Sequence, residues 1–235
     1  MKKTFSLAIF ETMCSGWILY FTLFLLSIIG GSISDALTMS CASVHARSLD
    51  KYTNYSELAR NEVEGRDFRI VVSEVGSAVT FIAPHAGLIE YGTSEIAREL
   101  AGSSYNLYLF EGVKLRDNFS LHITSAHFDE PKATKIMAAS ELGISIHGYK
   151  DDSVDAILIG GMNIAVGAAI SKSLRDLDIA IEFPSKKFKG DSADNIVNKA
   201  RKNGVQLEIS SKLRRSLISN PQKLRLFVNA VRTSL

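Results

Sequence analysis

Short apolar runs recur along the chain from residue 69 onward, separated by polar stretches and bounded by Gly, Asp, Asn or Ser. Runs of β-branched and aromatic residues of this length, closed by turn-forming residues, are typical of β-strands. They predict seven strands, at residues 69–74, 78–83, 106–112, 143–148, 155–161, 178–183 and 205–210.

Between these runs, apolar residues recur at the spacings of one helix face. Helices are therefore predicted at residues 93–102, 130–143, 163–174 and 194–204, and in the region from 211 to the C-terminus. Near-continuous apolar strands that alternate with helices indicate a sheet covered on both faces. We expect an α/β fold with an open, mostly parallel or mixed sheet, helices on both faces, and one hydrophobic helix preceding it at the N-terminus.

The N-terminal region is a separate unit by composition. Residues 12–34 contain no charged residue, follow Lys2 and Lys3, and number 23, which at ~1.5 Å per residue is enough to cross a ~30 Å hydrocarbon layer. A cleaved signal peptide with a small-x-small site at 44–46 is the second interpretation, and a buried helix of a soluble protein is the third. The first two place the rest of the chain outside the cytoplasm, anchored in the cell membrane or exported. We expect an anchor or signal with its linker at residues 1–46 and one globular domain at 47–235.

Composition narrows the chemistry of that domain. Hydrophobic residues make up 46% of the chain and charged residues 22%, which is typical of a folded protein. The two cysteines, Cys14 and Cys41, both precede residue 47. The predicted domain therefore has no Cys-ligated zinc ribbon, no catalytic cysteine and no disulfide framework.

Three polar residues each close an apolar strand: His85, His147 and Glu208. Ligands of open α/β sheets bind beyond the carboxyl ends of strands, so these side chains are expected to converge. Glu90 follows His85 by five residues, and a turn at Gly87 would fold it back toward the histidine. Hydrolytic zinc sites use three His or Glu ligands, which His85, Glu90 and His147 supply, while Glu208 would act as general base.

Other interpretations of the same residues stay open. A histidine at a strand end is more often a hydrogen-bonded surface residue than a ligand, and Glu208 is equally compatible with pairing to Arg214 or Arg215. Either His122 or His127 is an alternative ligand in place of His147. Otherwise His122 is expected to point into the core, and His127 to line the groove or orient a neighbour.

Five segments together resemble the phage-type poly-γ-glutamate hydrolase family: "PHAGLIEYGTSEIA", "LHITSAHFDEP", "SIHGY", "ILIGGMN" and "GVQLEIS" followed by "LR". The resemblance runs in order from about Tyr52 to Leu235. It implies a carboxypeptidase-like zinc hydrolase with one Zn²⁺ ion. The metal ligands of that family fall on His85, Glu90 and His147, and its catalytic carboxylate falls on Glu208.

Charge bears on the substrate. Residues 199–235 contain nine Lys or Arg and one acid, whereas residues 47–198 contain 16 basic and 22 acidic residues. A basic region beside the proposed base suits an anionic polymer or peptide, although a lipid-facing or merely solvated basic surface has the same composition. We expect His127, Asn198 and Arg214 to bind the substrate. No nucleic-acid motif is present, so nucleic acid is not an expected partner.

The resulting functional prediction is a zinc-dependent hydrolase that cleaves γ-glutamyl amide bonds of poly-γ-glutamate or a related substrate. The alternatives are a zinc amidase or peptidase of the same fold that acts on another substrate, and a non-catalytic phage-related binding protein. The sequence leaves the oligomeric state open.

Overall fold

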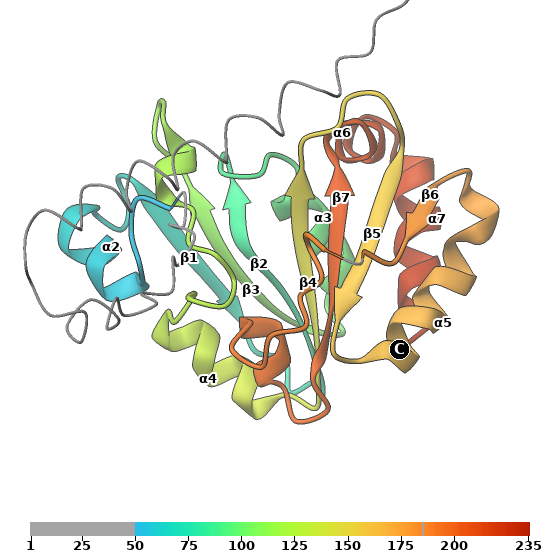
Figure 1. The fold of residues 1–235 in the computed structure, drawn as a ribbon, viewed down its shortest axis with the longest axis horizontal. Coiled ribbons are helices and arrows are strands. Elements are labelled where there is room, and N and C mark those ends of the chain that lie inside the picture. The colour runs from blue at the N-terminus through green and yellow to red at the C-terminus, as the bar shows by residue number, and fades with distance from the viewer. Residues whose placement is uncertain (1–49, 185) are drawn as a thin grey trace, which may run out of the picture. The chain divides into compact units, whose positions relative to one another are not determined.

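A computed structural model describes residues 50–184 and 186–235. All seven predicted strands are present in one sheet (Figure 1): β1 (Phe68–Ser73), β2 (Val79–Gly87), β3 (Asn106–Gly112), β4 (Leu142–Tyr149), β5 (Ala156–Gly161), β6 (Ala180–Glu182) and β7 (Gly204–Ser210). The strand order is β1-β3-β2-β4-β7-β5-β6. The pairs β1–β3 and β5–β7 are antiparallel and the other four are parallel, so the sheet is mixed, as predicted.

The described residues form six α-helices: α2 (Tyr55–Asn61), α3 (Thr93–Ala101), α4 (Pro131–Ala139), α5 (Ile164–Leu174), α6 (Ser211–Ser219) and α7 (Pro221–Arg232). The C-terminal helical region is divided in two at Asn220, whose side chain accepts from the backbone N–H groups of Gln222 and Lys223 and so caps α7. Helix α2 lies in a stretch of the domain where no helix was predicted from the sequence.

The helix predicted at residues 194–204 is wrong. Only a 3₁₀ turn, η4 (Ile196–Lys199), forms there. The Asn195 side chain accepts from the N–H of Val197, and Asn203 adopts a left-handed conformation with φ of 59°. Asparagines offer the backbone such local alternatives to a helix, and here they prevailed over the apolar spacing.

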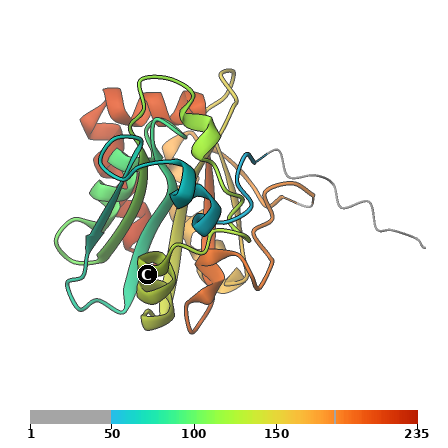
Figure 2. The ribbon, with the colours of Figure 1, turned by 90° about the vertical axis from the view of Figure 1, so that its left-hand side faces the viewer.

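Helices cover both faces of the sheet (Figures 1 and 2). Residues of α3, α5, α6 and α7 form one buried apolar cluster with the sheet, on what we call the four-helix face. Residues of α2, α4 and η4 form a second cluster, on the two-helix face. Leu107 and Leu109 of β3 belong to the first cluster, while Tyr108 and Phe110 belong to the second, which is the side-chain alternation of a strand buried on both sides.

The predicted N-terminal hydrophobic helix lies outside the described residues. Within residues 50–184 and 186–235, no helix combines the length and apolar composition needed to cross a bilayer.

Candidate metal centre

A β-bulge in β2 decides where His85 points. Pro84 and His85 together lie opposite one residue of β3, because Ala83 pairs with Leu109 and Ala86 pairs with Glu111. Proline has no N–H for the ladder, and bulges are where a central strand accommodates it. Ala83 and Ala86 both pack on the four-helix face, three residues apart, so the extra residue turns His85 to the two-helix face.

The strands β4 and β7 also direct a polar residue to the two-helix face, and they do so without a bulge. Ile146 and Leu207 pack on the four-helix face, so the next residues, His147 and Glu208, point to the two-helix face. These two residues are direct neighbours in the parallel pairing of β4 with β7. The carboxyl ends of three strands thus present His85, His147 and Glu208 on one side of the sheet.

The predicted turn at Gly87 brings Glu90 back to this edge. Gly87 has a φ of 67°, and a Cβ there would lie 2.5 Å from the carbonyl oxygen of Gly112, so the position requires glycine. The turn closes with a hydrogen bond of 2.9 Å from the Glu90 N–H to the His85 carbonyl oxygen. The Glu90 carboxylate then accepts from the Gly148 N–H at 2.7 Å, which fixes it between β2 and β4.

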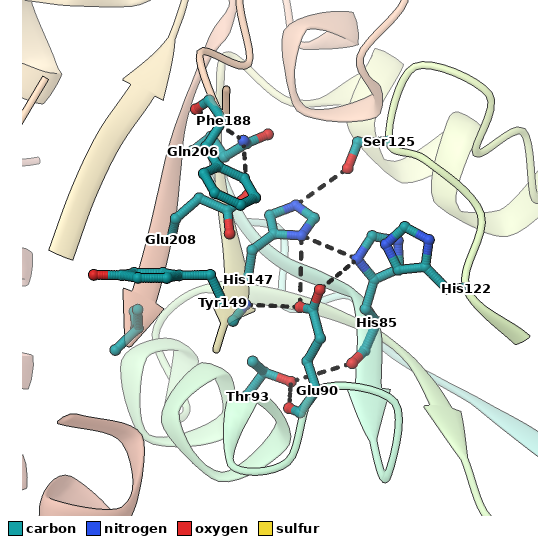
Figure 3. A network of polar contacts seen from close by, with 12 residues as sticks. His85, Glu90, Thr93, His122, Ser125, His147, Tyr149, Phe188, Gln206 and Glu208 are labelled. Carbon is teal, nitrogen blue, oxygen red and sulfur yellow. Dashed lines mark hydrogen bonds and ion pairs between the residues drawn. The ribbon is translucent and has the colours of Figure 1, made fainter. Parts of the chain in front are cut away.

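Three side chains direct donor atoms at one point (Figure 3). The Nδ1 atom of His85 lies 3.1 Å from Nδ1 of His147 and 3.2 Å from Oε1 of Glu90, and Nδ1 of His147 lies 3.7 Å from Oε2 of Glu90. His85 Nε2 donates to the Ile123 carbonyl oxygen at 2.8 Å, so in the neutral ring Nδ1 carries the lone pair.

This donor set fits a metal ion. Two nitrogens bound tetrahedrally to one zinc ion at ~2.0–2.1 Å are about 3.3 Å apart, close to the separation of the two Nδ1 atoms. Lone pairs and a carboxylate that face one another repel unless a cation or a proton lies between them. Burial alone would raise the pKa of Glu90, but the positive charge of His85 and His147 in their protonated form, together with their hydrogen bonds, more than offsets this and holds its pKa well below the usual range.

His122 is a less suitable ligand than His147. Ligand-type atoms of His85, Glu90 and His122 lie within 4.8 Å of one another. However, the His122 ring stacks on the His85 ring, with centroids 3.9 Å apart and planes at 30°. One of its two ring nitrogens, Nδ1, is already bonded to Asp50 Oδ1 at 2.6 Å, whereas Nδ1 of His147 faces both His85 and Glu90. The geometry therefore favours His147, and His122 lines the cleft instead of pointing into the core.

Glu208 lies beside His147 and is 5% exposed. Burial raises the pKa of Glu208 to about 7. The negative charge of Glu90 raises this pKa further, whereas the positive charge of His147 lowers it. Gln206 donates to Oε1 of Glu208 at 3.0 Å, which leaves Oε2 for other partners. Among the described residues, Glu208 forms no ion pair with an arginine: Arg215 pairs with Asp152 at 2.8 Å. A carboxyl group with this pKa accepts and releases protons near neutral pH.

These residues line a cleft of about 350 Å³. Its other walls include Thr124, Ser125, Gln206 and the loop from Lys186 to Ser192. The two lysines in the lining are Lys186 and Lys189, and Lys189 is paired with Asp191. None of the nine basic residues of region 199–235 lines this cleft. The basic side chains in its walls therefore come from the loop at 186–192 and not from the C-terminal region that the sequence indicated.

The three predicted substrate-binding residues lie outside the lining. His127 borders a separate hollow with Phe128 and Asp129. Asn198 is buried, and its side chain is bonded to backbone groups. Its Nδ2 donates to the carbonyl oxygens of Gly190 and Ser192 in the cleft loop, and its Oδ1 accepts from the N–H groups of Met162 and Gly204.

Arg214 is also buried and is committed to backbone groups. Its guanidinium donates to the carbonyl oxygens of Tyr91, Tyr149 and Ile209. It crosses directly over Gly148, where a Cβ would lie 2.0 Å from Nη1. In this structure Arg214 therefore supports the loops that carry the site and does not face the cleft.

Sequence reasoning missed Ser125, Gln206 and Lys186. Gln206 was within reach, because a residue two positions before Glu208 on a strand shares its face. Lys186, Lys187 and Lys189 were visible as a charge cluster, but nothing local indicates that this loop packs against Gln206 of β7.

The sequence is similar to those of known proteins. Residues 52–228 match the sequence profile of the family described as poly-gamma-glutamate hydrolase. The SPbeta prophage-derived UPF0714 protein YoqZ of Bacillus subtilis (strain 168) is 41% identical over 173 residues, which are 72% of this chain but only 62% of that protein. The UPF0714 protein YndL of the same organism is 40% identical over 183 residues, 75% of this chain and 69% of that protein.

Two solved structures share the fold. A bacteriophage poly-gamma-glutamate hydrolase superposes with a TM-score of 0.75 at 34% identity, over 79% of this chain and 96% of the other. A structure described as zinc-free YndL gives 0.73 at 35% identity, with the same coverage. The family profile covers well over half of the chain, and the strands that carry His85, His147 and Glu208 all lie within it. The chain belongs to the poly-gamma-glutamate hydrolase family.

Proposed function

We propose that this chain is a zinc-dependent hydrolase that cleaves γ-glutamyl amide bonds of poly-γ-glutamate or a related anionic substrate. The observation that carries the proposal is the convergence of His85, Glu90 and His147, with Glu208 alongside, in a member of this family. The zinc-free description of the similar YndL structure supports zinc as the metal.

The three candidate ligands would hold one ion, which when bound lowers the pKa of a water ligand to ~7 and polarises a carbonyl oxygen. Glu208 Oε2 accepts the proton of the attacking water, because Oε1 is occupied by the Gln206 amide. As the C–N bond breaks, Glu208 returns that proton to the leaving nitrogen. Its raised pKa suits both transfers, although a bound cation would lower that pKa.

The cleft loop supplies the charge that an anionic substrate requires. Lys186 lines the cleft and has no ion-pair partner among the described residues, whereas Lys189 is paired with Asp191. Lysine ammonium groups bind carboxylates and raise the local concentration of anionic substrates. Lys186 therefore replaces the C-terminal basic region as the proposed carboxylate contact.

The test uses the full-length chain, purified in detergent and supplied with zinc. We expect it to shorten poly-γ-glutamate, measured by size-exclusion chromatography, and to leave α-linked polyglutamate intact. Zinc binding without cleavage of either polymer would favour an amidase or peptidase with another substrate. A purified chain that binds no zinc would indicate a non-catalytic protein.

We also propose that residues 1–46 anchor or export the domain at 47–235. The supporting observation is the uncharged stretch at 12–34 after two lysines. Full-length protein is expected in the membrane fraction of cells. Mature protein that begins near Arg47 would show that the segment is a cleaved signal.

A further inference from the structure

The two candidate histidine ligands are oriented by the same short segment of chain. His85 Nε2 donates to the carbonyl oxygen of Ile123 at 2.8 Å, and His147 Nε2 lies 3.3 Å from the hydroxyl oxygen of Ser125. In both rings, the nitrogen that faces away from Glu90 is bonded to residues 122–125, which we call the orienting segment. Such bonds select the ring tautomer that presents Nδ1 as a lone pair.

One carboxylate holds this segment in place. Asp50 Oδ1 lies 2.6 Å from Nδ1 of His122, and Asp50 Oδ2 accepts from the backbone N–H of Thr124 at 2.6 Å. The Asp50 side chain is 4% exposed. Its two oxygens therefore fix two residues that flank Ile123, the acceptor for His85.

The His122 ring completes the attachment. Its centroid lies 3.9 Å from that of His85, with the planes at 30°, and it stacks on Phe119 with centroids 5.1 Å apart. With Nδ1–H donated to Asp50, the ring is held at its polar edge and by contacts with two other rings. A shift of the segment would therefore move the hydrogen-bond partners of His85 and His147 together.

We propose that Asp50 is a positioning residue of the metal centre: it sets the place of the orienting segment and so the direction of both imidazole ligands. This inference rests on the proposed zinc site. Asp50 is separated from His122 by 72 residues and lies at the start of the globular domain, four positions after Ala46. Zinc affinity thus depends on the position of the first residues of the domain, which include Asp50.

The experiment compares zinc affinity in full-length variants by competition with a chromophoric chelator. Removing a partner that orients a metal ligand typically weakens binding 10–100-fold, and we expect a loss of about that size for Asp50→Ala. Ser125→Ala, which removes the hydroxyl partner of His147 Nε2, is expected to weaken binding about 10-fold. The visible spectrum of the Co²⁺-substituted chain should change in both variants, because the ligand directions change.

Asp129→Ala is the matched control. Asp129 also joins the start of the domain to this region, by accepting from the Tyr55 N–H at 2.7 Å, but it has no bond to the orienting segment. We expect its zinc affinity to stay within about threefold of wild type. Equal losses for Asp50→Ala and Asp129→Ala would overturn the inference, because general loosening of the domain would then explain both.

A second variant keeps the test decisive if Asp50→Ala does not fold. His122→Phe retains a stacked ring and removes only the bond to Asp50, so zinc should bind several-fold more weakly with an altered Co²⁺ spectrum. Unchanged affinity and spectrum in the folded Asp50 or His122 variant would overturn the inference. Wild-type protein that binds no zinc would instead overturn the proposed function.

Discussion

The two faces of the central strands differ in what they contribute. On the four-helix face, β7 presents Val205, Leu207 and Ile209, all buried in the apolar cluster. On the opposite face, the same strand presents Gln206 and Glu208 to the cleft. Strand alternation thus puts fold-stabilising and chemical residues one position apart, so neighbouring substitutions should have opposite effects on stability and activity.

In strand β2, placing the site residue on the cleft face requires an irregularity in the strand, a β-bulge. With regular alternation, His85 would point to the four-helix face with Ala83, away from His147 and Glu208. The bulge at Pro84 and His85 reverses the side on which the next side chain projects. Bulges next to functional sites re-aim side chains in this way.

The largest expected effect is at His147. His147→Ala removes one of three candidate ligands, so we expect loss of stoichiometric zinc together with all measurable cleavage of poly-γ-glutamate. Metal analysis of the purified variant measures the first, and size-exclusion chromatography of the polymer measures the second. His122→Phe should still bind one zinc ion at saturating metal. Full zinc occupancy in the His147 variant would remove it from the ligand set.

Glu208→Gln keeps the shape of the side chain and removes its basicity. Because general acid–base catalysis contributes ~10²–10⁴-fold, turnover should fall by about that factor. Zinc content and KM should change little, since the lost interaction belongs to the transition state. Near-normal turnover in a stable variant would mean that the base lies elsewhere in the cleft.

Leu207→Ala changes the adjacent residue on the four-helix face. Truncating a fully buried leucine leaves a cavity and should lower the free energy of unfolding by about 2–5 kcal/mol, as measured by denaturant titration. Folded protein should retain one zinc ion and near-normal turnover. A loss of metal comparable to that of His147→Ala would contradict the division of labour between the faces.

The polar face also makes a pH-dependent contribution to stability. The pKa of Glu208 is about 7 in the metal-free fold against 4.5 for the free group, so its neutral form favours folding below pH 4.5, and this is lost as pH rises through 7. At pH 8, metal-free Glu208→Gln should therefore be about 1–3 kcal/mol more stable than wild type, and the gap should narrow toward pH 4.5. If the stability difference between the two proteins did not vary with pH, the fold would not disfavour the charged form of Glu208, which would contradict its raised pKa.

The smallest effect is expected at the rim of the cleft. Lys186→Ala should raise KM for poly-γ-glutamate several-fold, in keeping with ~1 kcal/mol for a partly exposed charge pair. Lys187 carries the same charge on the same loop but does not line the cleft, so Lys187→Ala is the matched control. Equal KM values for the two variants would assign the effect to overall charge.

Much of the fold was accessible from the sequence, because apolar runs closed by turn residues directly encode strands, and all seven formed. The turn that returns Glu90 to His85 was predicted from Gly87, and its φ and the nearby Gly112 carbonyl explain why glycine is needed. For His147 and Glu208, the sequence predicted only that the two side chains converge at one edge of the sheet. Their exact pairing follows from the register of β4 and β7, which no local pattern specifies.

The sequence did not reveal side-chain roles that depend on contacts between residues far apart in the chain. Asn198 and Arg214 have the chemistry to bind a substrate, yet their bonds go to backbone groups that long-range folding brings to them. Asp50 reaches His122 across 72 positions, and an acidic residue in the polar stretch that begins the domain carries no local sign of such a contact.

A zinc titration of the metal-free, full-length chain tests the central claim most directly. With γ-linked polyglutamate present, cleavage should rise in proportion to added zinc and stop rising at one equivalent per chain, because His85, Glu90 and His147 form one site. Full cleavage by the metal-free chain would contradict this account, as would zinc binding at one equivalent that produces no cleavage.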